Sequence, residues 1–130
     1  MSQSFFDDVK DFHVKFGLPS PSSPQPLSEH LNSFRTGFMH EELGEYMDAV
    51  RDGDLEKQLD SLVDLVYVAC GTAVMHGFDF NEAWRRVHEA NLKKVRVERL
   101  DDSKRASTFD VVKPAGWQHP DLFDLVQEVK

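Results

Sequence analysis

Apolar residues recur at helical spacing along most of this chain. This recurrence is typical of amphipathic helices, because one face of an α-helix returns every three to four residues. The spacing predicts four main helices, which span approximately residues 3–16, 27–51, 54–75 and 80–97. No segment shows the alternation of apolar and polar residues that marks a half-buried strand. We therefore expect an all-α, four-helix-bundle-like fold in a single domain, residues 1–130.

Proline and glycine separate these predicted helices. The segment LPSPSSPQP, residues 18–26, holds four of the six prolines and is expected to be an extended connector, because proline cannot continue a helix. Gly53 is placed to end the second helix. Residues 101–119 lack helical periodicity and are expected to be irregular, and the segment PDLFDLVQEVK is expected to close the chain with a short helix.

The second helix carries acids on a face that begins as an apolar stripe. The stripe consists of Leu27, Leu31, Phe34 and Phe38. Extending it by three or four residues reaches Glu41 and Glu42, and then Glu45. A second apolar stripe, Met39, Leu43, Met47 and Val50, lies on a different side. A solvated face does not usually continue a core stripe, although a helix that leaves the core could do so.

The third helix adds two more carboxylates. It is apolar or small on all sides from Leu62 to Met75, apart from Asp64, and Asp60 lies one turn earlier. A buried carboxylate must be paired, protonated or bound to metal, and a salt bridge from Asp64 to Arg35 or a lysine is the simplest structural alternative. Five carboxylates on two successive helices exceed what one or two bases could neutralise. An all-oxygen cluster of this kind suits Mg²⁺ or Mn²⁺, which are often bound together with substrate phosphates.

Composition narrows the class of protein. The chain has ten Phe, two Trp and 40% hydrophobic residues, which is enough to form a core. Its one cysteine, Cys70, lies among apolar residues and is expected to be a buried thiol. The N-terminal segment lacks the pattern of a signal peptide, and the longest nearly apolar stretch, residues 62–75, has 14 residues and contains an Asp. We expect a soluble, cytoplasmic protein without a membrane partner.

The net charge of −8 is distributed unevenly. Residues 1–80 hold 5 Lys and Arg against 14 Asp and Glu, whereas residues 81–105 hold 8 against 5. An acidic protein with one locally basic stretch is poorly suited to general nucleic-acid binding. The pattern favours a small anion, such as a phosphate compound.

Several segments together resemble a known superfamily. EELGE (41–45) is similar to the EExxE motif of the all-α nucleoside triphosphate pyrophosphatases, the MazG-like and phosphoribosyl-ATP pyrophosphohydrolase-like superfamily. The segment 60–80 resembles the second-motif helix of its small, often phage-encoded members. HEANLKKV (88–95) and VVKPAGWQHPDL (111–122) resemble later segments of the same proteins. One departure is that the acid before Asp64 is Asp60, four positions earlier, where many members have an acid three positions earlier.

The resemblance implies an activity and a site. It implies hydrolysis of a nucleoside triphosphate between the α- and β-phosphates, with two or more Mg²⁺ ions held by the two helices. The implied metal ligands are Glu41, Glu42, Glu45, Asp60 and Asp64. Either Glu41 or Glu42 would orient the attacking water or accept its proton. The implied substrate contacts are Asn91 on sugar or phosphate, Lys94 or its neighbour Lys93 on phosphate, Arg35 on phosphate or the first-motif acids, and His13 near the base.

Other interpretations remain open. The acids could form a structural metal site or a salt-bridge network in a non-catalytic helical module, and phosphoribosyl-ATP is an alternative substrate within the superfamily. The base is not encoded by any motif, so dGTP or GTP, dUTP and dCTP are all candidates. The apolar surface of the second and third helices predicts a homo-oligomer, a dimer or a tetramer, because four helices can cover only part of it. If the chain is virus-encoded, it would act in the host cytoplasm.

Overall fold

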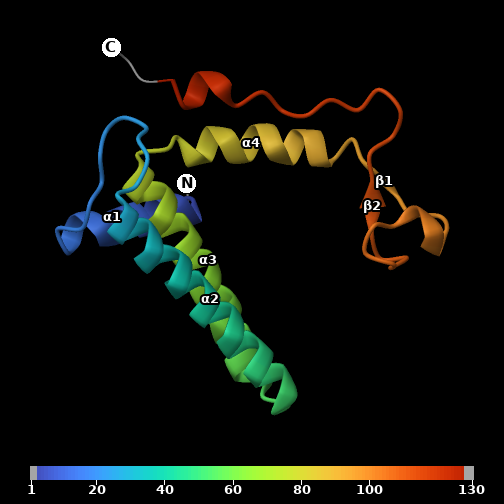
Figure 1. Cartoon of the computed structure of the whole chain (residues 1–130), viewed down its shortest axis with the longest axis horizontal. Coiled ribbons are helices and arrows are strands. Elements are labelled where there is room, and N and C mark those ends of the chain that lie inside the picture. The colour runs from blue at the N-terminus through green and yellow to red at the C-terminus, as the bar shows by residue number, and fades with distance from the viewer. Residues whose placement is uncertain (1–2, 128–130) are drawn as a thin grey trace. The chain divides into compact units, whose positions relative to one another are not determined.

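The computed structural model describes residues 3–127, and its regular structure is almost wholly helical (Figure 1). The helices are α1 (Phe5–Lys15), α2 (Glu29–Arg51), α3 (Leu55–His76) and α4 (Phe80–Asn91). Two short strands, β1 (Val95–Arg96) and β2 (Val111–Val112), pair antiparallel, and two 3₁₀ turns span Leu100–Asp102 and Phe123–Leu125. The prediction of an all-α, bundle-like fold is confirmed.

The described residues form two compact units. One comprises residues 3–80 and 125–127, and the other comprises residues 81–124. The first unit contains α1, α2 and α3, and the second contains nearly all of α4 and both strands. The prediction of a single domain over residues 1–130 stays a prediction.

Helices α2 and α3 lie side by side as a long antiparallel hairpin (Figure 1). The turn between them contains Gly53, whose φ of +67° is a conformation that glycine adopts without strain. Asp54 then begins α3, since its side chain accepts a hydrogen bond of 3.0 Å from the backbone N–H of Lys57. Ser28 begins α2 in the same manner. Because the hairpin is tight, the middle of α2 faces the first half of α3.

The core of the first unit lies where α1 packs on the C-terminal half of α3. Its buried members are Phe6, Val9, Cys70, Ala73 and Val74. The ring of Phe80 packs on that of Phe6, with 5.5 Å between centroids. The thiol of Cys70 is buried as predicted, and this burial raises its pKa.

The predicted core face of α1 is wrong by one position. The helical spacing of Phe5, Val9, Phe12 and Phe16 predicts that these residues form its core face, but only Val9 is buried and the three Phe side chains are exposed. The buried face consists of Phe6, Val9 and His13. Since apolar residues occupy two adjoining faces of α1, periodicity alone could not choose between them, and the contact with α3 makes the choice.

The two apolar stripes of α2 are only partly buried. Leu31 and Phe38 are half-buried but Phe34 is exposed, and Leu43, Met47 and Val50 of the second stripe are exposed. The segment of α3 from Leu62 to Met75 was expected to be buried on most sides, but Leu62, Val63 and Val66 are exposed. Leu55 and Leu59, which precede this segment, are exposed as well. The hairpin thus exposes large apolar side chains on both of its helices.

The proline-rich connector packs back on the C-terminal end of α3. The backbone N–H of Gln25 donates to the carbonyl of His76 at 2.9 Å, and His76 Nδ1 lies 2.8 Å from the carbonyl oxygen of Gln25. Gly77 ends the helix with a φ of +73°, and a Cβ there would collide with the carbonyl of Ser23. The connector is therefore fixed to the helix it crosses.

Helix α3 is long and apolar enough, by length and composition, to cross a membrane, and it is the one such helix within residues 3–127. It has 22 residues, with a mean hydropathy of 1.3 in its most apolar window, so it extends beyond the 14-residue stretch singled out in the sequence. Within the structure 39% of that window is buried. Core helices of soluble proteins have the same composition, so this property does not identify a membrane span.

The second unit departs from the predicted fourth helix. Helix α4 ends at Asn91 rather than near residue 97, and Val95 and Arg96 pair with Val112 and Val111 in a strand ladder that was not predicted. Residues 113–121 then return along α4, where the indole N–H of Trp117 donates to the carbonyl of Ala90 at 2.8 Å. In the segment 120–130, which was predicted to form a short helix, the structure has a 3₁₀ turn at Phe123–Leu125, and residues 128–130 lie outside the described residues.

Candidate functional site

Three carboxylates converge between α2 and α3. Glu42 and Glu45 of α2 and Asp64 of α3 each offer an oxygen, and these atoms all lie within 4.8 Å of one another. Glu42 and Glu45 share a face because they are three positions apart on one helix. The hairpin brings Asp64 opposite them. The structure thus unites acids from both of the motifs that the sequence singled out.

Glu42 is the most unusual member of the group. Its side chain is buried, with 8% of its surface exposed, and Oε2 has no hydrogen-bond partner among the described residues. Burial raises the pKa of Glu42 to about 7, and the negative charges of Glu45, Asp64 and Glu41 add to the rise. Burial also raises the pKa of Asp64, helped by the charges of Asp60 and Glu45. The neighbouring negative charges therefore make Glu42 and Asp64 harder to ionise.

No base neutralises this cluster within residues 3–127. Arg35, the base proposed as a partner for Asp64, forms no ion pair with it, and neither does any lysine of the described chain. A buried carboxylate oxygen without a donor costs free energy unless a cation or proton compensates it. The donor set consists of carboxylate oxygens alone, which suits a hard divalent cation. The residues present therefore fit a bound metal.

Glu41 and Asp60, the other two expected ligands, lie outside the group of three. Both are exposed. Glu41 affects the cluster through its charge on Glu42, and Asp60 through its charge on Asp64. Glu41 and Asp60 therefore lie at the edge of the cluster, and their charges act on Glu42 and Asp64 respectively.

Arg35 has a different environment from the expected one. Arg35 is 6% exposed, and its guanidinium donates to the carbonyl of Val68 at 2.9 Å and to the hydroxyl of Thr72 at 3.2 Å. It also lies against the rings of Phe34 and Phe38, 5.9 Å and 5.4 Å from their centroids. The expectation that Arg35 orients the first-motif acids finds no hydrogen bond or ion pair in its favour among the described residues. Arg35 instead joins α2 to α3.

His13 lies beside Arg35. It is 2% exposed, and its Nδ1 lies 3.2 Å from the carbonyl oxygen of Pro19. Burial lowers the pKa of His13, and the charge of Arg35 lowers it further. Both side chains point at Gly71 of α3, which offers no Cβ to obstruct them.

These two residues line an apolar pocket of about 400 Å³ in the first unit. Aromatic rings supply much of its wall, and the contributing residues are Phe12, Phe34, Phe38 and Tyr67. The lining residues with polar side chains are His13, His30, Arg35 and Tyr67. Sequence reasoning missed Tyr67 and Gly71, because each enters the site only through the packing of α3 against α1 and α2.

One family model, Phosphoribosyl-ATP pyrophosphohydrolase, matches residues 9–91. This match spans well over half of the 130 residues and includes the three carboxylates and the aromatic pocket. The chain belongs to the phosphoribosyl-ATP pyrophosphohydrolase family. No curated protein matches the chain.

The family indicates the general chemistry of the carboxylate cluster. Pyrophosphohydrolases of this MazG-like kind act on nucleotides and generally use a divalent metal. The acid cluster of this pyrophosphohydrolase is of the type that binds such an ion. The superfamily suspected from EELGE and the later motifs is confirmed.

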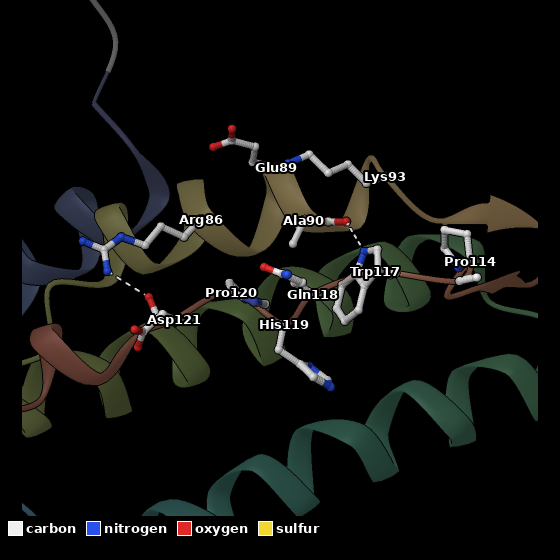
Figure 2. A pocket seen from close by; sticks show the side chains of 12 residues that line it. Arg86, Glu89, Ala90, Lys93, Pro114, Trp117, Gln118, His119, Pro120 and Asp121 are labelled. Atoms are coloured by element: carbon white, nitrogen blue, oxygen red, sulfur yellow. Dashed lines mark hydrogen bonds between the residues drawn. The ribbon is translucent and has the colours of Figure 1, made fainter.

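The remaining predicted substrate contacts lie in the second unit. Asn91 is the last residue of α4 and is exposed, and Lys93 and Lys94 follow in the turn after it. Lys93 lines a cavity of about 510 Å³ between α4 and the returning chain, which Trp117 and His119 also line (Figure 2). Lys94 lies over the Trp117 ring, 5.2 Å from its centroid. The family match ends at residue 91, so both lysines of this pyrophosphohydrolase lie beyond it.

Proposed function

We propose that this protein is a Mg²⁺-dependent pyrophosphohydrolase that cleaves a nucleoside or deoxynucleoside triphosphate between its α- and β-phosphates. The products would be a nucleoside monophosphate and pyrophosphate. The observation that carries the proposal is that Glu42, whose Oε2 is buried and has no hydrogen-bond partner among the described residues, belongs to a group of three acids with Glu45 and Asp64. One carboxylate oxygen from each of the three lies within 4.8 Å of the others. A buried oxygen of this kind is explained by a cation that brings a charged substrate to it.

Glu42, Glu45 and Asp64 would hold the metal, with Asp60 at the edge of the site. When bound there, two or more Mg²⁺ or Mn²⁺ ions would polarise phosphate oxygens and lower the pKa of a coordinated water. Glu41 lies outside the three-acid group but close enough for its charge to act on Glu42. We assign to Glu41 the task of orienting the attacking water and accepting its proton, with Glu42 as the other candidate.

The aromatic pocket supports a nucleotide as the substrate. Its rings offer flat apolar surfaces on which a base can stack, and His13 and Arg35 supply the polar contacts that a base requires. Because burial lowers the pKa of His13, the imidazole is neutral at pH 7 and can accept as well as donate a hydrogen bond. The pocket supports a role for His13 in substrate binding, and it gives Arg35 a place near the base.

Phosphoribosyl-ATP is the second candidate substrate, favoured by the family model itself. It carries the same triphosphate and a purine, so the same acids would serve. A substrate panel separates the two candidates. Release of pyrophosphate should be measured with the four ribonucleoside triphosphates, the four deoxynucleoside triphosphates, dUTP and phosphoribosyl-ATP, each with and without Mg²⁺.

The expected result is pyrophosphate and a monophosphate from at least one nucleoside triphosphate, with the highest kcat/KM among dUTP, dCTP, dGTP and GTP. Activity confined to phosphoribosyl-ATP would replace the proposed substrate and leave the reaction unchanged. Orthophosphate and a diphosphate as first products would contradict cleavage at the α–β bond. No turnover of any compound, together with an intact helical fold, would favour the non-catalytic metal-binding module.

The apolar surface of α3 supports a homo-oligomer, a dimer or a tetramer. Leu55, Leu59 and Val63 are exposed on one helix, and Leu62 and Val66 line a further apolar pocket of about 450 Å³ with Phe5. A second copy would remove this surface from water. We propose in addition that the protein acts in the cytoplasm, or the host cytoplasm if a virus encodes it, without a nucleic-acid or membrane partner.

A further inference from the structure

Two lysines of the second unit meet on one indole ring. Lys94 Nζ lies 5.2 Å from the centroid of Trp117, and Lys113 Nζ lies 5.1 Å from it. His119 packs edge-on against the same indole at 4.9 Å between centroids, and its Nε2 lies 3.5 Å from Lys113 Nζ. Three residues with nitrogen-bearing side chains thus surround Trp117. We call Lys94, Lys113, Trp117 and His119 the Trp117 cluster.

The position of Trp117 is fixed by the backbone. Its indole N–H donates to the carbonyl of Ala90 at the end of α4, and its own N–H donates to the carbonyl of Pro114 at 3.0 Å. Gly116 before it has a φ of +81°, so the turn that presents the indole uses a conformation suited to glycine. Figure 2 shows Trp117 and His119 extending from the returning chain to the same side of α4. The position of the indole is therefore set by backbone hydrogen bonds and not by chance contact of a free side chain.

The lysines of the cluster lack the counter-charges that the neighbouring arginines have. Arg85 and Arg86 pair with Glu82, Arg86 also pairs with Asp124, and Arg105 pairs with Asp110. No carboxylate of residues 3–127 forms an ion pair with Lys94 or Lys113. Cation–π contacts attract each ammonium to the ring but leave its charge unneutralised. Two like charges so placed would be stabilised by an anion.

We propose that the Trp117 cluster binds a pyrophosphoryl group. Both ammonium groups lie about 5 Å from one centroid, so they are no more than about 10 Å apart. An anion with two linked phosphoryl groups can offer one charged end to each lysine, and charge-assisted hydrogen bonds to phosphate are the stronger kind. His119 supplies a further donor at Nε2 or Nδ1.

The proposal deepens the proposed function, on which it rests for the identity of the anion. Free pyrophosphate and the β–γ end of a nucleoside triphosphate share the chemistry that the cluster recognises. The test must therefore separate these two sources, and it must detect binding without any turnover.

The fluorescence of Trp117 reports binding directly. The chain has two tryptophans, so Trp84→Phe leaves Trp117 as the single indole. In this full-length variant, with EDTA present, pyrophosphate and a triphosphate analogue with an α,β-imido bridge are titrated separately at constant ionic strength. We expect a saturable change in Trp117 emission, because an anion that contacts the ammonium and imidazole groups alters their quenching of the indole.

Substitutions identify the cluster as the site. Lys94→Ala or Lys113→Ala, each in the Trp84→Phe background, should weaken binding by about tenfold or more, as expected for the loss of a charged hydrogen bond. The Lys94→Ala and Lys113→Ala double variant should show no saturation. Lys104→Ala is the matched control, since Lys104 is an exposed lysine of the same unit outside the cluster, and it should bind as the parent does.

A response to pyrophosphate identifies the released product as a ligand, and a response to the analogue alone identifies the substrate's β–γ end. No saturable response to either anion, an unchanged affinity in the double variant, or tighter binding of a single-stranded oligonucleotide would overturn the proposal. Its failure is distinguishable from failure of the proposed function. Wild-type hydrolysis without a Trp117 response defeats the cluster alone, whereas pyrophosphate binding without hydrolysis of any nucleotide defeats the activity alone.

Discussion

Arg35 lies so close to Gly71 that even a methyl side chain at residue 71 would collide with its guanidinium. A Cβ at Gly71 would lie 2.6 Å from Nη2 of Arg35 and 2.9 Å from Nε2 of His13. Gly71 is itself buried, in the C-terminal half of α3. The absence of a side chain at this one position allows residues from α1 and α2 to meet α3 beneath the aromatic pocket.

Gly71→Ala should therefore weaken substrate binding more than it slows chemistry. The new methyl displaces the guanidinium of Arg35 from the carbonyl of Val68, and hydrogen bonds to charged groups are worth about 1.5–3 kcal/mol. We expect KM to rise by about tenfold or more while kcat changes by less than about threefold, measured by steady-state pyrophosphate release. Gly37→Ala on α2 is the control, since a Cβ there meets nothing within 4 Å. Equal kinetics for both variants would remove Arg35 and His13 from the pocket's function.

Replacing the acids of the cluster should abolish turnover. Glu42→Gln and Asp64→Asn keep the size of each side chain but remove a negative oxygen that the metal requires. Even the loss of a residue that only hydrogen-bonds to a metal ligand lowers metal affinity or activity by about 10–100-fold. For loss of a ligand itself we expect kcat/KM to fall by about 100-fold or more. Circular dichroism should show unchanged helicity.

Asp48→Asn is the control for these two variants. Asp48 also lies on α2, but its side chain is exposed and pairs only with Arg51 at 3.4 Å among the described residues. Its activity should match that of the wild type. Near wild-type rates for both Glu42→Gln and Asp64→Asn with Mg²⁺ would show that the assigned site is wrong.

Asp110 should make the second unit sensitive to acid. The Arg105 guanidinium at 2.6 Å, the Ser103 hydroxyl at 2.7 Å and the Val111 N–H at 2.8 Å hold the pKa of Asp110 at about 2. This folded-state pKa lies below the ordinary value of 3.8, so the unfolded state binds the proton more strongly. The stabilisation is complete above about pH 4 and is lost as the pH falls from about 4 to 2.

Thermal melts between pH 5 and pH 2 measure this effect. Asp110→Asn should be less stable than the wild type at pH 5 but should lose less stability on acidification. Asp101→Asn is the control, since Asp101 is exposed and its contact with Arg99 is long, at 3.8 Å. Parallel pH profiles for the wild type and Asp110→Asn would contradict the assignment.

The exposed apolar side chains of α3 predict self-association. Light scattering during size exclusion at low micromolar concentration should give a mass of at least twice the 14.9 kDa of the chain. Val63→Asp should shift the protein toward the monomer, because it introduces a charge into the surface that a second copy would cover. Lys57→Ala on the same helix should not. A fully active wild-type monomer would defeat the proposal.

The sequence predicted the first three helices closely because each has a long periodic pattern and clear end signals. The fourth helix was overextended and the strand pair was missed, since two-residue strands are too short to show alternation. Val95 and Val111 are β-branched residues that suit strands, and the ladder that contains them pairs residues 17 and 15 positions apart in sequence, Val95 with Val112 and Arg96 with Val111.

Some residues of the candidate site could likewise be predicted from the sequence, and others could not. Glu42, Glu45 and Asp64 could be placed together from helix geometry, because only one hairpin separates their helices. The sequence could not show that Glu41 and Asp60 lie apart from that group, since this depends on how far each helix is rotated about its axis. Arg35 illustrates the limit most clearly. Its contacts with Val68 and Thr72 are made 33 and 37 residues along the chain, and no local pattern specifies them.

The connector between α1 and α2 should resist cleavage by proteases, unlike a flexible linker. Exposed connectors between helices are often cleaved, because a protease must draw an extended stretch of backbone into its own cleft. Here Gln25 and His76 hold each other's backbone, and the segment lies against Gly77. Freeing residues 18–26 would require the last turn of α3 to open. Cleavage after brief digestion is therefore expected in the exposed segment around Lys104 and Arg105, and the fragment that holds the carboxylate cluster should remain whole.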